Sequence, residues 1–299
     1  MTRDYASPAS FKNALEQRLR NSAKSGYEFT RKRQLLVFDR FLARIVVFFG
    51  EKVTLKGGLV LELRVEHARA TKDVDLRLVG SPENLLQQLQ EAGQLGLGDF
   101  MEFQVAPDGA HPTIQNDGMQ YDGLRFRAEC KLAGKVYGQP FGVDVASGDP
   151  MFGEPEVVLA DDVLSFAGIA PPAVRVYPIE THIAEKLHAY TMPRHRPNTR
   201  VKDLPDMALL ATAQAIDGKR LKEAFEQTFV FRKTHALPTS LPDPPPTWAT
   251  PYAAMARENK LAWAELSDVT RAAQSFVDPV LAQRIDATWD PERFLWCAH

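Results

Sequence analysis

The spacing of apolar residues predicts two long helices at the start of the chain. Ser7-Pro8 fits an N-cap followed by proline at the first helical position, so a helix should run from there to about residue 25. A second helix, over about 30–49, places Leu35, Phe38 and Leu42 at three- and four-residue intervals. We expect both helices to pack on the sheet that follows.

Beyond residue 50 the apolar pattern alternates between strand and helix periods. Strands are expected near 52–56, 73–79, 101–106, 122–132 and 135–146, and helices near 58–66 and 82–92. A turn at Ala133-Gly134 should join the last two strands. The pattern predicts an α+β fold built on a mixed sheet with flanking helices.

The pattern becomes helical after Pro171-Pro172. A short strand over 174–177 should precede helices near 178–191, 203–215, 218–228 and 251–259, with one or two more after residue 262. Residues 237–246 hold five prolines and should form an extended connector. We therefore expect two domains, with the sheet and the N-terminal helices in residues 1–172 and mainly helices in residues 173–299.

Composition is ordinary for a soluble protein. The 299 residues are 44% hydrophobic and 25% charged, which is enough for two cores. Cys130 and Cys297 have no disulfide or metal-ligand spacing. No apolar run approaches the roughly 20 residues of a membrane helix, and the first residues do not begin a signal peptide. We expect a cytoplasmic protein without a membrane partner.

The net charge of −2 conceals a basic N-terminal region. Residues 1–64 hold 13 Lys and Arg against 6 Asp and Glu. Such a region could steer a polyanion, and the alternative is a set of solvated helix faces. The run from Arg194 to Lys202 could likewise hold nucleic-acid phosphates, or merely flank a loop.

The strongest chemical pattern lies between residues 55 and 78. A strand enters Gly57-Gly58, which opens a helix whose free N–H groups suit a phosphate. The next strand carries Asp73 and Asp75 on one face, about 7 Å apart, where they repel each other unless a cation lies between them. Together these features indicate a site for Mg²⁺ and a nucleoside triphosphate.

Other residues could complete this site. Asp144, between two valines on its own strand, would supply a third carboxylate, as phosphoryl transfer with two metal ions requires. Lys186 would suit phosphates, although a lysine on a surface helix commonly has no such role. Asp203 is well placed to cap a helix. The seven histidines show no zinc pattern.

In this order the motifs resemble the DNA polymerase β nucleotidyltransferase superfamily, whose pattern is a Gly-Gly or Gly-Ser turn, a later Asp-x-Asp and a distal Asp. More closely, the chain resembles the AbiEii/AbiGii toxin family of prokaryotic toxin–antitoxin and phage-defence systems. The segments that carry this resemblance are 55–58, 69–75, 143–145, 184–189, 202–206 and 228–238. It implies a polymerase β-like nucleotidyltransferase domain followed by a helical C-terminal domain.

The resemblance implies a role for each matching residue. These are Lys56, Gly57, Gly58 and Thr71 at the nucleotide, Asp73, Asp75 and Asp144 as Mg²⁺ ligands, Lys186 at the phosphates, and Asp203 ordering the site. Related toxins present a hydroxyl at the position of Thr71, which makes it a candidate for inhibitory phosphorylation; otherwise it would bond the local backbone.

The chain departs from the family pattern at two positions. Ile183 replaces a lysine that many members have, so Lys56 or Arg200 would have to supply that contact. Pro205 replaces the usual aromatic residue, which leaves the relative roles of Asp203 and Asp206 open.

The resemblance implies a toxin that transfers a nucleotide from an NTP to RNA. The reaction would depend on Mg²⁺, with two ions bound at the site. The 3′ end of tRNA is the expected acceptor, pyrophosphate is released, translation stops, and a cognate antitoxin restrains the effect. The alternatives are transfer to a protein or small molecule, or a catalytically silent relative that binds RNA or a protein. The sequence does not identify the base, the acceptor or the antitoxin.

Overall fold

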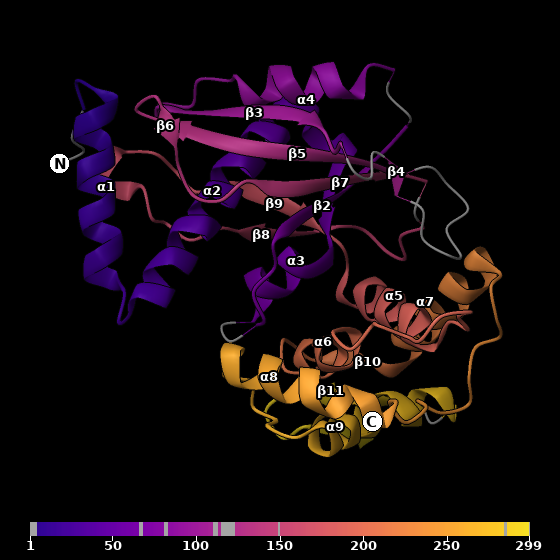
Figure 1. The fold of residues 1–299 in the computed structure, drawn as a ribbon. Coiled ribbons are helices and arrows are strands. Elements are labelled where there is room, and N and C mark those ends of the chain that lie inside the picture. The colour runs from indigo at the N-terminus through magenta and orange to yellow at the C-terminus, as the bar shows by residue number, and fades with distance from the viewer. Residues whose placement is uncertain are drawn as a thin grey trace.

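The computed structural model describes residues 5–65, 68–80, 83–109, 113–114, 123–148, 150–283 and 286–298. A mixed sheet and its helices form one part of the molecule, and a mainly helical part lies beneath it in Figure 1. Within the described residues, no helix combines the length and the apolar character needed to cross a membrane.

The helices and strands follow one another along the whole chain. The helices are α1 (Pro8–Ser22), α2 (Gly26–Phe49), α3 (Gly57–Arg64), α4 (Leu85–Gly93), α5 (Ile179–Thr191), α6 (Asp203–Leu210), α7 (Gly218–Arg232), α8 (Ala249–Asn259) and α9 (Leu266–Leu281). The strands are β1 (Val53–Lys56), β2 (Asp73–Leu78), β3 (Met101–Pro107), β4 (Thr113–Ile114), β5 (Gly123–Leu132), β6 (Lys135–Val136), β7 (Phe141–Ser147), β8 (Glu156–Leu159), β9 (Ala173–Val176), β10 (Ile216–Asp217), β11 (Ala287–Asp290) and β12 (Leu295–Ala298).

The main sheet is mixed, which confirms the predicted α+β class. In the described part of the chain its strands follow the order β3-β5-β7-β2-β1-β9-β8, and β4 and β6 pair with β5. β2 runs parallel to β7 and β1 runs parallel to β9, while the other pairs are antiparallel. Strands from distant parts of the sequence therefore lie side by side at the centre of the sheet.

Helices α2 and α4 cover one face of this sheet. Phe41 of α2 packs against Phe103 of β3 and Phe141 of β7, with ring centroids 5.4 and 5.3 Å apart. Burying such a ring contributes about 1.5–3 kcal/mol. Because side chains alternate along a strand, the residues between the buried apolar ones point to the other face of the sheet, among them Asp73 and Asp75 of β2.

A buried ion cluster joins α2 to the start of β3. Arg40 and Arg44 lie 2.7 and 2.6 Å from the carboxylate of Asp99, and all three side chains are at most 4% exposed. Burial disfavours the charged form of Asp99, but hydrogen bonds and charges from Arg44 and Arg40 outweigh it and lower its pKa. Two residues of the basic N-terminal surplus are thus structural and cannot reach a polyanion.

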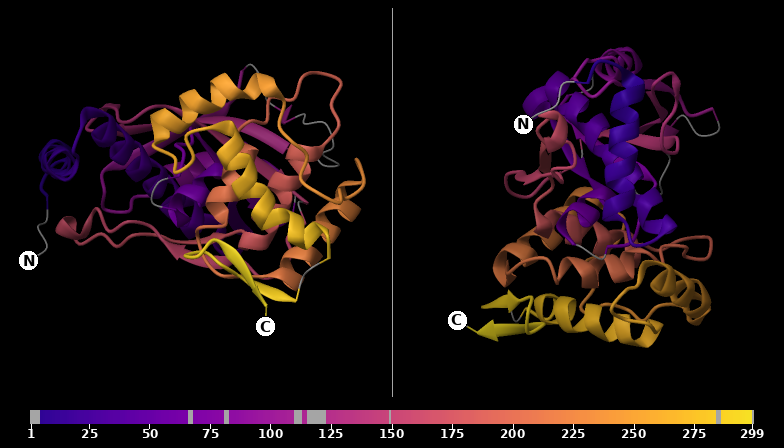
Figure 2. Two further views of the ribbon diagram at one scale, coloured as in Figure 1. Left: turned by 90° about the horizontal axis from the view of Figure 1, so that it is seen from below. Right: turned by 90° about the vertical axis from the view of Figure 1, so that its left-hand side faces the viewer.

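A second core lies among the C-terminal helices. Trp289 of β11 is fully buried, contacts the Phe276 ring at 4.9 Å, and donates its indole N–H to the Ala211 carbonyl at 2.7 Å. Leu61 of α3 belongs to this core as well. Figure 2 shows α9 and the β11–β12 hairpin at the end of the molecule away from the main sheet. A domain boundary at residue 172 stays a proposal.

Several predicted boundaries are wrong. The strand expected over 135–146 is divided into β6 and β7, because Gly138 turns the chain with a φ of +74° and Pro140 has no N–H for the ladder. The expected helix over 203–215 ends at Leu210, and the sequence pattern does not predict β8, β10 or the β11–β12 hairpin. The predicted element ends at residues 66, 82 and 122 lie outside the described residues.

We predict that Asp99→Asn destabilises the protein by about 3–5 kcal/mol, because Arg40 and Arg44 would stay buried without a counter-charge. Denaturant unfolding at neutral pH measures the change. Asp286→Asn is the control: Asp286 pairs with Lys219 at the surface and is 77% exposed, so its loss should cost no more than about 1 kcal/mol. Equal costs for both variants would contradict a structural role for the cluster.

Candidate active site

Strands β2 and β7 bring three aspartates to one face of the sheet. Asp73 and Asp75 are two residues apart on β2 and so share a face. Asp144 of β7 is the register partner of Asp75 across a parallel pair, which places it on that face, about 4.8 Å away along the hydrogen-bonding direction. The backbone thus assembles the three carboxylates that the sequence singles out, on the face not covered by α2 and α4.

The Gly57-Gly58 turn lies against Asp75. Gly57 begins α3 with a φ of +70°, and a Cβ there would lie 2.0 Å from Oδ2 of Asp75, so only glycine fits. Among the described side chains none caps α3, whose first N–H groups are therefore available to an anion. An anion cradle and the carboxylates are immediate neighbours.

Arg125 holds Asp144, a role that none of the sequence motifs predicts. Its Nε and Nη2 donate to the two carboxylate oxygens at 2.7 and 2.6 Å. Arg125 is the register partner of Asp144 on β5, and its side chain is 36% exposed. The only signal in the sequence is that Arg125 and Arg127 flank the buried Phe126, which indicates their face of the sheet but not their partner.

The carboxyl group of Asp75 has a raised pKa. Burial is the main cause and the neighbouring charge of Asp144 the second, and together they raise the pKa to about 6 against the opposing charges of Lys56 and Lys186. A cation placed beside Asp75 and Asp144 would relieve this repulsion and favour both ionised forms.

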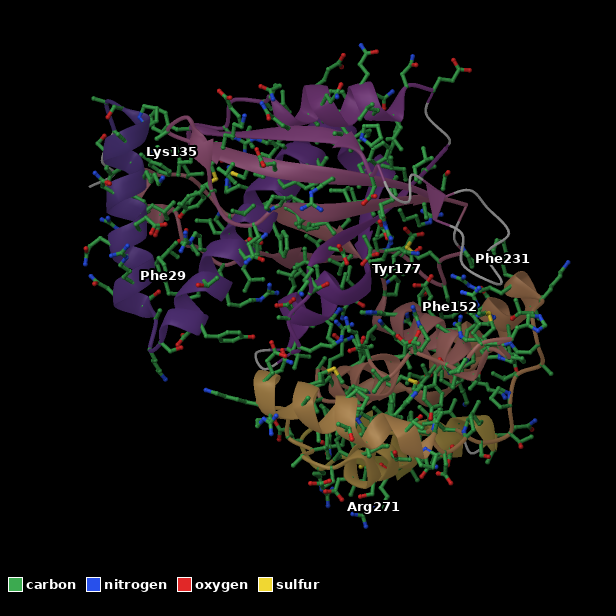
Figure 3. The ribbon with its side chains drawn as sticks, in the orientation of Figure 1. Phe29, Lys135, Phe152, Tyr177, Phe231 and Arg271 are labelled. Carbon is green, nitrogen blue, oxygen red and sulfur yellow. The ribbon has the colours of Figure 1, made fainter. Side chains whose placement is uncertain are left out.

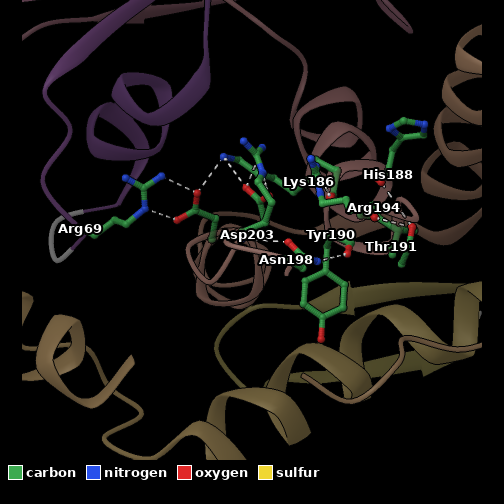
Figure 4. A network of polar contacts seen from close by, with 12 residues as sticks. Arg69, Lys186, His188, Tyr190, Thr191, Arg194, Asn198 and Asp203 are labelled. Atoms are coloured by element: carbon green, nitrogen blue, oxygen red, sulfur yellow. Dashed lines mark hydrogen bonds and ion pairs between the residues drawn. The ribbon is translucent and has the colours of Figure 1, made fainter. Parts of the chain in front are cut away.

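A buried ion network ties α5 and α6 to the segment before β2 (Figure 4). Arg69 donates from Nε and Nη2 to the two oxygens of Asp206, both at 2.7 Å. Lys186 Nζ lies 2.8 Å from Asp206 and 3.4 Å from Asp203. Burial opposes ionisation of Asp206, but Lys186 and Arg69 lower its pKa. Asp206, whose role the sequence leaves open, is the centre of this network.

Asp203 lies at the edge of the same network. Lys202 occupies the N-cap position of α6, so Asp203 is the first helical residue and does not cap the helix. Its carboxylate accepts from Arg200 Nε at 2.6 Å, and Arg200 is 41% exposed. The interpretation of Asp203 as an N-cap is therefore wrong, and its charge instead connects Lys186 to the basic loop.

Lys56 lies between the sheet and α5. It is the register partner of Asp75 on β1, and its Nζ is 3.5 Å from Glu185 of α5. Arg232 of α7 also reaches Glu185, at 3.0 Å. Burial disfavours ionisation of Glu185, but Lys56 and Arg232 lower its pKa. Lys56 and Lys186 thus bring two positive charges to the side of Asp75.

Thr71 is buried beside the glycine turn. A Cβ on Gly58 would lie 2.9 Å from Thr71 Oγ1, and that hydroxyl is 3.5 Å from the Asp73 carbonyl. Thr71 accepts from Arg31 at its carbonyl, at 3.0 Å, and its N–H donates to Glu62. The structure brings Thr71 to the cradle, in a segment held in place by an ion pair between Arg31 and Glu62.

His182 lies one turn before Lys186 on α5 and is fully buried. Its two ring nitrogens have no hydrogen-bond partner in the described part of the chain. Burial, followed by the charge of Lys186, lowers its pKa to about 3, so the ring is neutral. Without access to solvent or to a polar partner, it is not a candidate general base.

The donor set fits a divalent cation. Carboxylate oxygens are the ligands that Mg²⁺ prefers. A Cβ at Gly142 would lie 2.5 Å from Oδ1 of Asp73, so this side chain occupies space that only glycine leaves. Within the described ranges, no three His, Cys, Asp or Glu side chains already converge as a metal site. Asp144 is turned toward Arg125, and an ion would require one of its oxygens to be released.

Comparison with known proteins identifies related chains. The family model described as nucleotidyl transferase AbiEii toxin, type IV toxin–antitoxin system, matches residues 40–292. This range contains the glycine turn, the three aspartates and the ion network. No curated protein sequence is similar enough to count as a relative.

Two solved structures share the fold. The nucleotidyltransferase toxin MenT4 from Mycobacterium tuberculosis H37Rv is 16% identical, with 95% of this chain and 92% of that chain covered and a TM-score of 0.54. JHP933 from Helicobacter pylori is 15% identical, with 88% and 96% covered and a TM-score of 0.50. At these identities the likeness is one of fold.

We predict that Gly57→Ala is more harmful than Gly50→Ala. Both positions have positive φ, so both variants should lose roughly 1–2 kcal/mol to backbone strain. Gly50 has open space around its Cα, whereas the new Cβ at Gly57 would collide with Asp75 and should cost about 1–3 kcal/mol more. Thermal unfolding and nucleotidyl-transfer assays measure the two losses. A fully active Gly57→Ala would contradict the close contact.

Proposed function

The chain belongs to the AbiEii family of nucleotidyl transferase toxins of type IV toxin–antitoxin systems, and we propose that it transfers a nucleotide from an NTP to RNA, with the 3′ end of tRNA as acceptor. The observation that supports this best is the meeting of Asp73, Asp75 and Asp144 with the uncapped start of α3. Carboxylates beside an anion cradle suit metal-dependent phosphoryl transfer.

In this proposal the three aspartates bind Mg²⁺, and we expect two Mg²⁺ ions at the site. When bound, Mg²⁺ would neutralise triphosphate charge and lower the pKa of the attacking hydroxyl. The hydroxyl oxygen of the acceptor forms a bond to the α-phosphorus, the bond to the bridging oxygen breaks, and pyrophosphate and a proton leave. Asp73 is the exposed member of the three and so lies nearest to an arriving acceptor.

The phosphates of the NTP would lie at the start of α3. The N–H groups of Gly57 and Gly58 would donate to them, and Lys56 and Lys186 would supply positive charge. Glu185 and the α6 aspartates already hold these lysines in place. Such preorganised charge needs no rearrangement when the transition state forms.

The acceptor RNA would approach along exposed basic residues near Asp73. Lys72 and Lys202 are exposed. Partial burial and the charge of Arg69 lower the pKa of Lys202, and Asp73 and Lys72 are close enough to act on it too. His195 and Arg196 are exposed in the preceding loop. This surface, rather than Arg40 or Arg44, would contact RNA phosphates.

Regulation would involve an antitoxin, as the family description implies. We propose a cognate antitoxin that restrains the toxin, and action in the cytoplasm, where NTPs and tRNA are available. Thr71 would be a second point of control, because a phosphate on its hydroxyl would add roughly −1.5 to −2 charge beside Gly58 and Asp73.

We predict that the purified protein, given each α-labelled NTP, Mg²⁺ and total RNA, labels RNA of tRNA size and releases pyrophosphate. Asp73→Asn should slow this about a thousandfold, because several kcal/mol of charge stabilisation are lost. Its metal-free melting temperature should stay equal or rise, since repulsion between the aspartates is relieved. Glu129→Gln, on the same face of the sheet but outside the site, is the control and should keep full activity.

The other outcomes of this assay are equally informative. Labelling of a protein or small molecule instead of RNA would replace the acceptor, and no labelling with any NTP would contradict nucleotidyl transfer. If RNA phosphates are bound, affinity should fall steeply with salt. Flat binding between low and moderate salt would count against an RNA acceptor.

We also predict that Arg125→Gln tightens divalent-cation binding. Arg125 competes with a cation for the oxygens of Asp144, but its side chain is partly exposed, so the gain should be about three- to tenfold. Calorimetric titration of the nucleotide-free protein with Mn²⁺ measures this. Lys131→Gln removes the same charge farther along β5 and should change affinity less than twofold. Unchanged binding by Arg125→Gln would contradict competition.

A further inference from the structure

A second site lies on the opposite side of the molecule from α5. A cavity of about 300 Å³, partly open to solvent, is lined by α1, α2 and the segment after β8. Figure 1 shows these elements together at the edge of the sheet domain, and the right-hand view of Figure 2 faces them. Its walls are largely aliphatic, formed by Leu19, Leu35, Leu36 and Val163. Nothing in the proposed transfer reaction uses it.

Two carboxylates line this cavity. Asp39, in the middle of α2, is 6% exposed, and its carboxylate makes no hydrogen bond or ion pair with another described side chain or backbone group. Asp161, on the segment after β8, lines the same cavity, and its charge acts on Asp39. A largely buried carboxylate without a partner is costly, because folding removes most of its hydration without supplying a counter-charge.

The basic residues around the cavity have partners other than Asp39. Lys32 Nζ lies 3.1 Å from Glu28 and donates to the Ser22 carbonyl at 2.6 Å. The Arg18 guanidinium lies 3.9 Å from the centre of the Phe166 ring. Arg40, the cation that follows Asp39 on α2, belongs to the Asp99 cluster. Among the described residues, none therefore provides a direct counter-ion for Asp39.

We propose that this cavity binds a positively charged nitrogen group on an aliphatic chain, an alkylguanidinium or alkylammonium. Asp39 and Asp161 would pair with the charge, and the leucine and valine walls would cover the alkyl part. A bare metal ion fits less well, because the walls are apolar and no third carboxylate, His or Cys among the described residues completes a metal site. The group can belong to a free diamine or to an arginine side chain of a polypeptide.

The protonation of Asp39 supplies a further readout. Burial is the main cause that raises its pKa to about 7, with Asp161 adding to the effect and Arg40 opposing it. Lys32 and Arg18 are the other charged groups at the cavity. Because a raised pKa favours the protonated form, Asp39 becomes ionised as the pH rises through about 7, and a cation should bind more tightly at pH 8.5 than at pH 5.5.

The test uses the full-length chain and agmatine, which carries a guanidinium on a four-carbon chain. Titration calorimetry and thermal unfolding should show saturable binding at pH 8.5 that weakens at least tenfold at pH 5.5. Asp39→Asn should weaken binding at least tenfold while remaining folded, since it removes an unpaired charge. Asp162→Asn is the matched control, because this neighbouring carboxylate does not line the cavity and should bind as the parent does.

Further ligands test whether the bound cation is a free amine or part of a polypeptide, and whether its charge is required. n-Butanol, which has the chain without the charge, should not bind. A blocked Gly-Arg-Gly peptide that binds through Asp39 as well as agmatine does, or better, would point to a polypeptide partner. Absence of saturable binding by both agmatine and the peptide at pH 8.5, or unchanged binding by Asp39→Asn, would overturn the proposal. Mg²⁺ that competes with agmatine at equal concentration would overturn the preference for an organic cation.

Discussion

The burial of Asp206 determines how the rest of the site is arranged. A carboxylate with no solvent exposure stays ionised only if cations surround it, and here Arg69 and Lys186 do so. Arg69 precedes β2 and Lys186 lies within α5, so one charge holds the strand of the aspartates against the C-terminal helices. Removing either cation would leave buried negative charge without its partner and should lower the free energy of unfolding by about 3–5 kcal/mol. The helix that contributes Lys186 is therefore in place before any substrate binds.

Two carboxylates, unlike that of Asp206, have no cation within hydrogen-bond distance among the described residues. Most buried acids in the described structure have a cation within hydrogen-bond distance, as Asp99 and Asp206 do. Asp75 instead lies beside Asp144, and its pKa is raised to about 6. Asp39 lies near Asp161, and its pKa is raised to about 7. Repulsion between neighbouring carboxylates costs stability, and at Asp75 the charges of Lys56 and Lys186 only partly offset it. Such positions therefore mark where an external cation would be most stabilising. Both of our ligand proposals follow from this physical argument. Figure 3 shows how densely side chains fill the space between the main sheet and its helices.

The distribution of basic residues along the sequence differs from their distribution in space. The N-terminal surplus includes Arg40 and Arg44, which neutralise Asp99 in the interior. Lys72 and Lys202, from opposite halves of the chain, are instead both exposed near Asp73. A polyanion responds to charge at the surface, so the folded arrangement, and not the local count, indicates where RNA would bind.

Much of the fold and part of the site follow from the sequence, because alternation and turn chemistry are local properties. The period of two along β2 is enough to put Asp73 and Asp75 on one face, and the glycine pair is enough to predict a turn into α3. The mixed sheet was predictable for the same reason. The two-residue strand β10 escaped prediction because it is held by pairing with β11, which is distant in the sequence, rather than by its own pattern. Only the tertiary structure decided that Arg125 holds Asp144 and that Asp206, rather than Asp203, is the centre of the ion network. Arg69 and Asp206 are 137 residues apart in the chain, and an ion pair between them exists only after folding has brought both into the same dry interior.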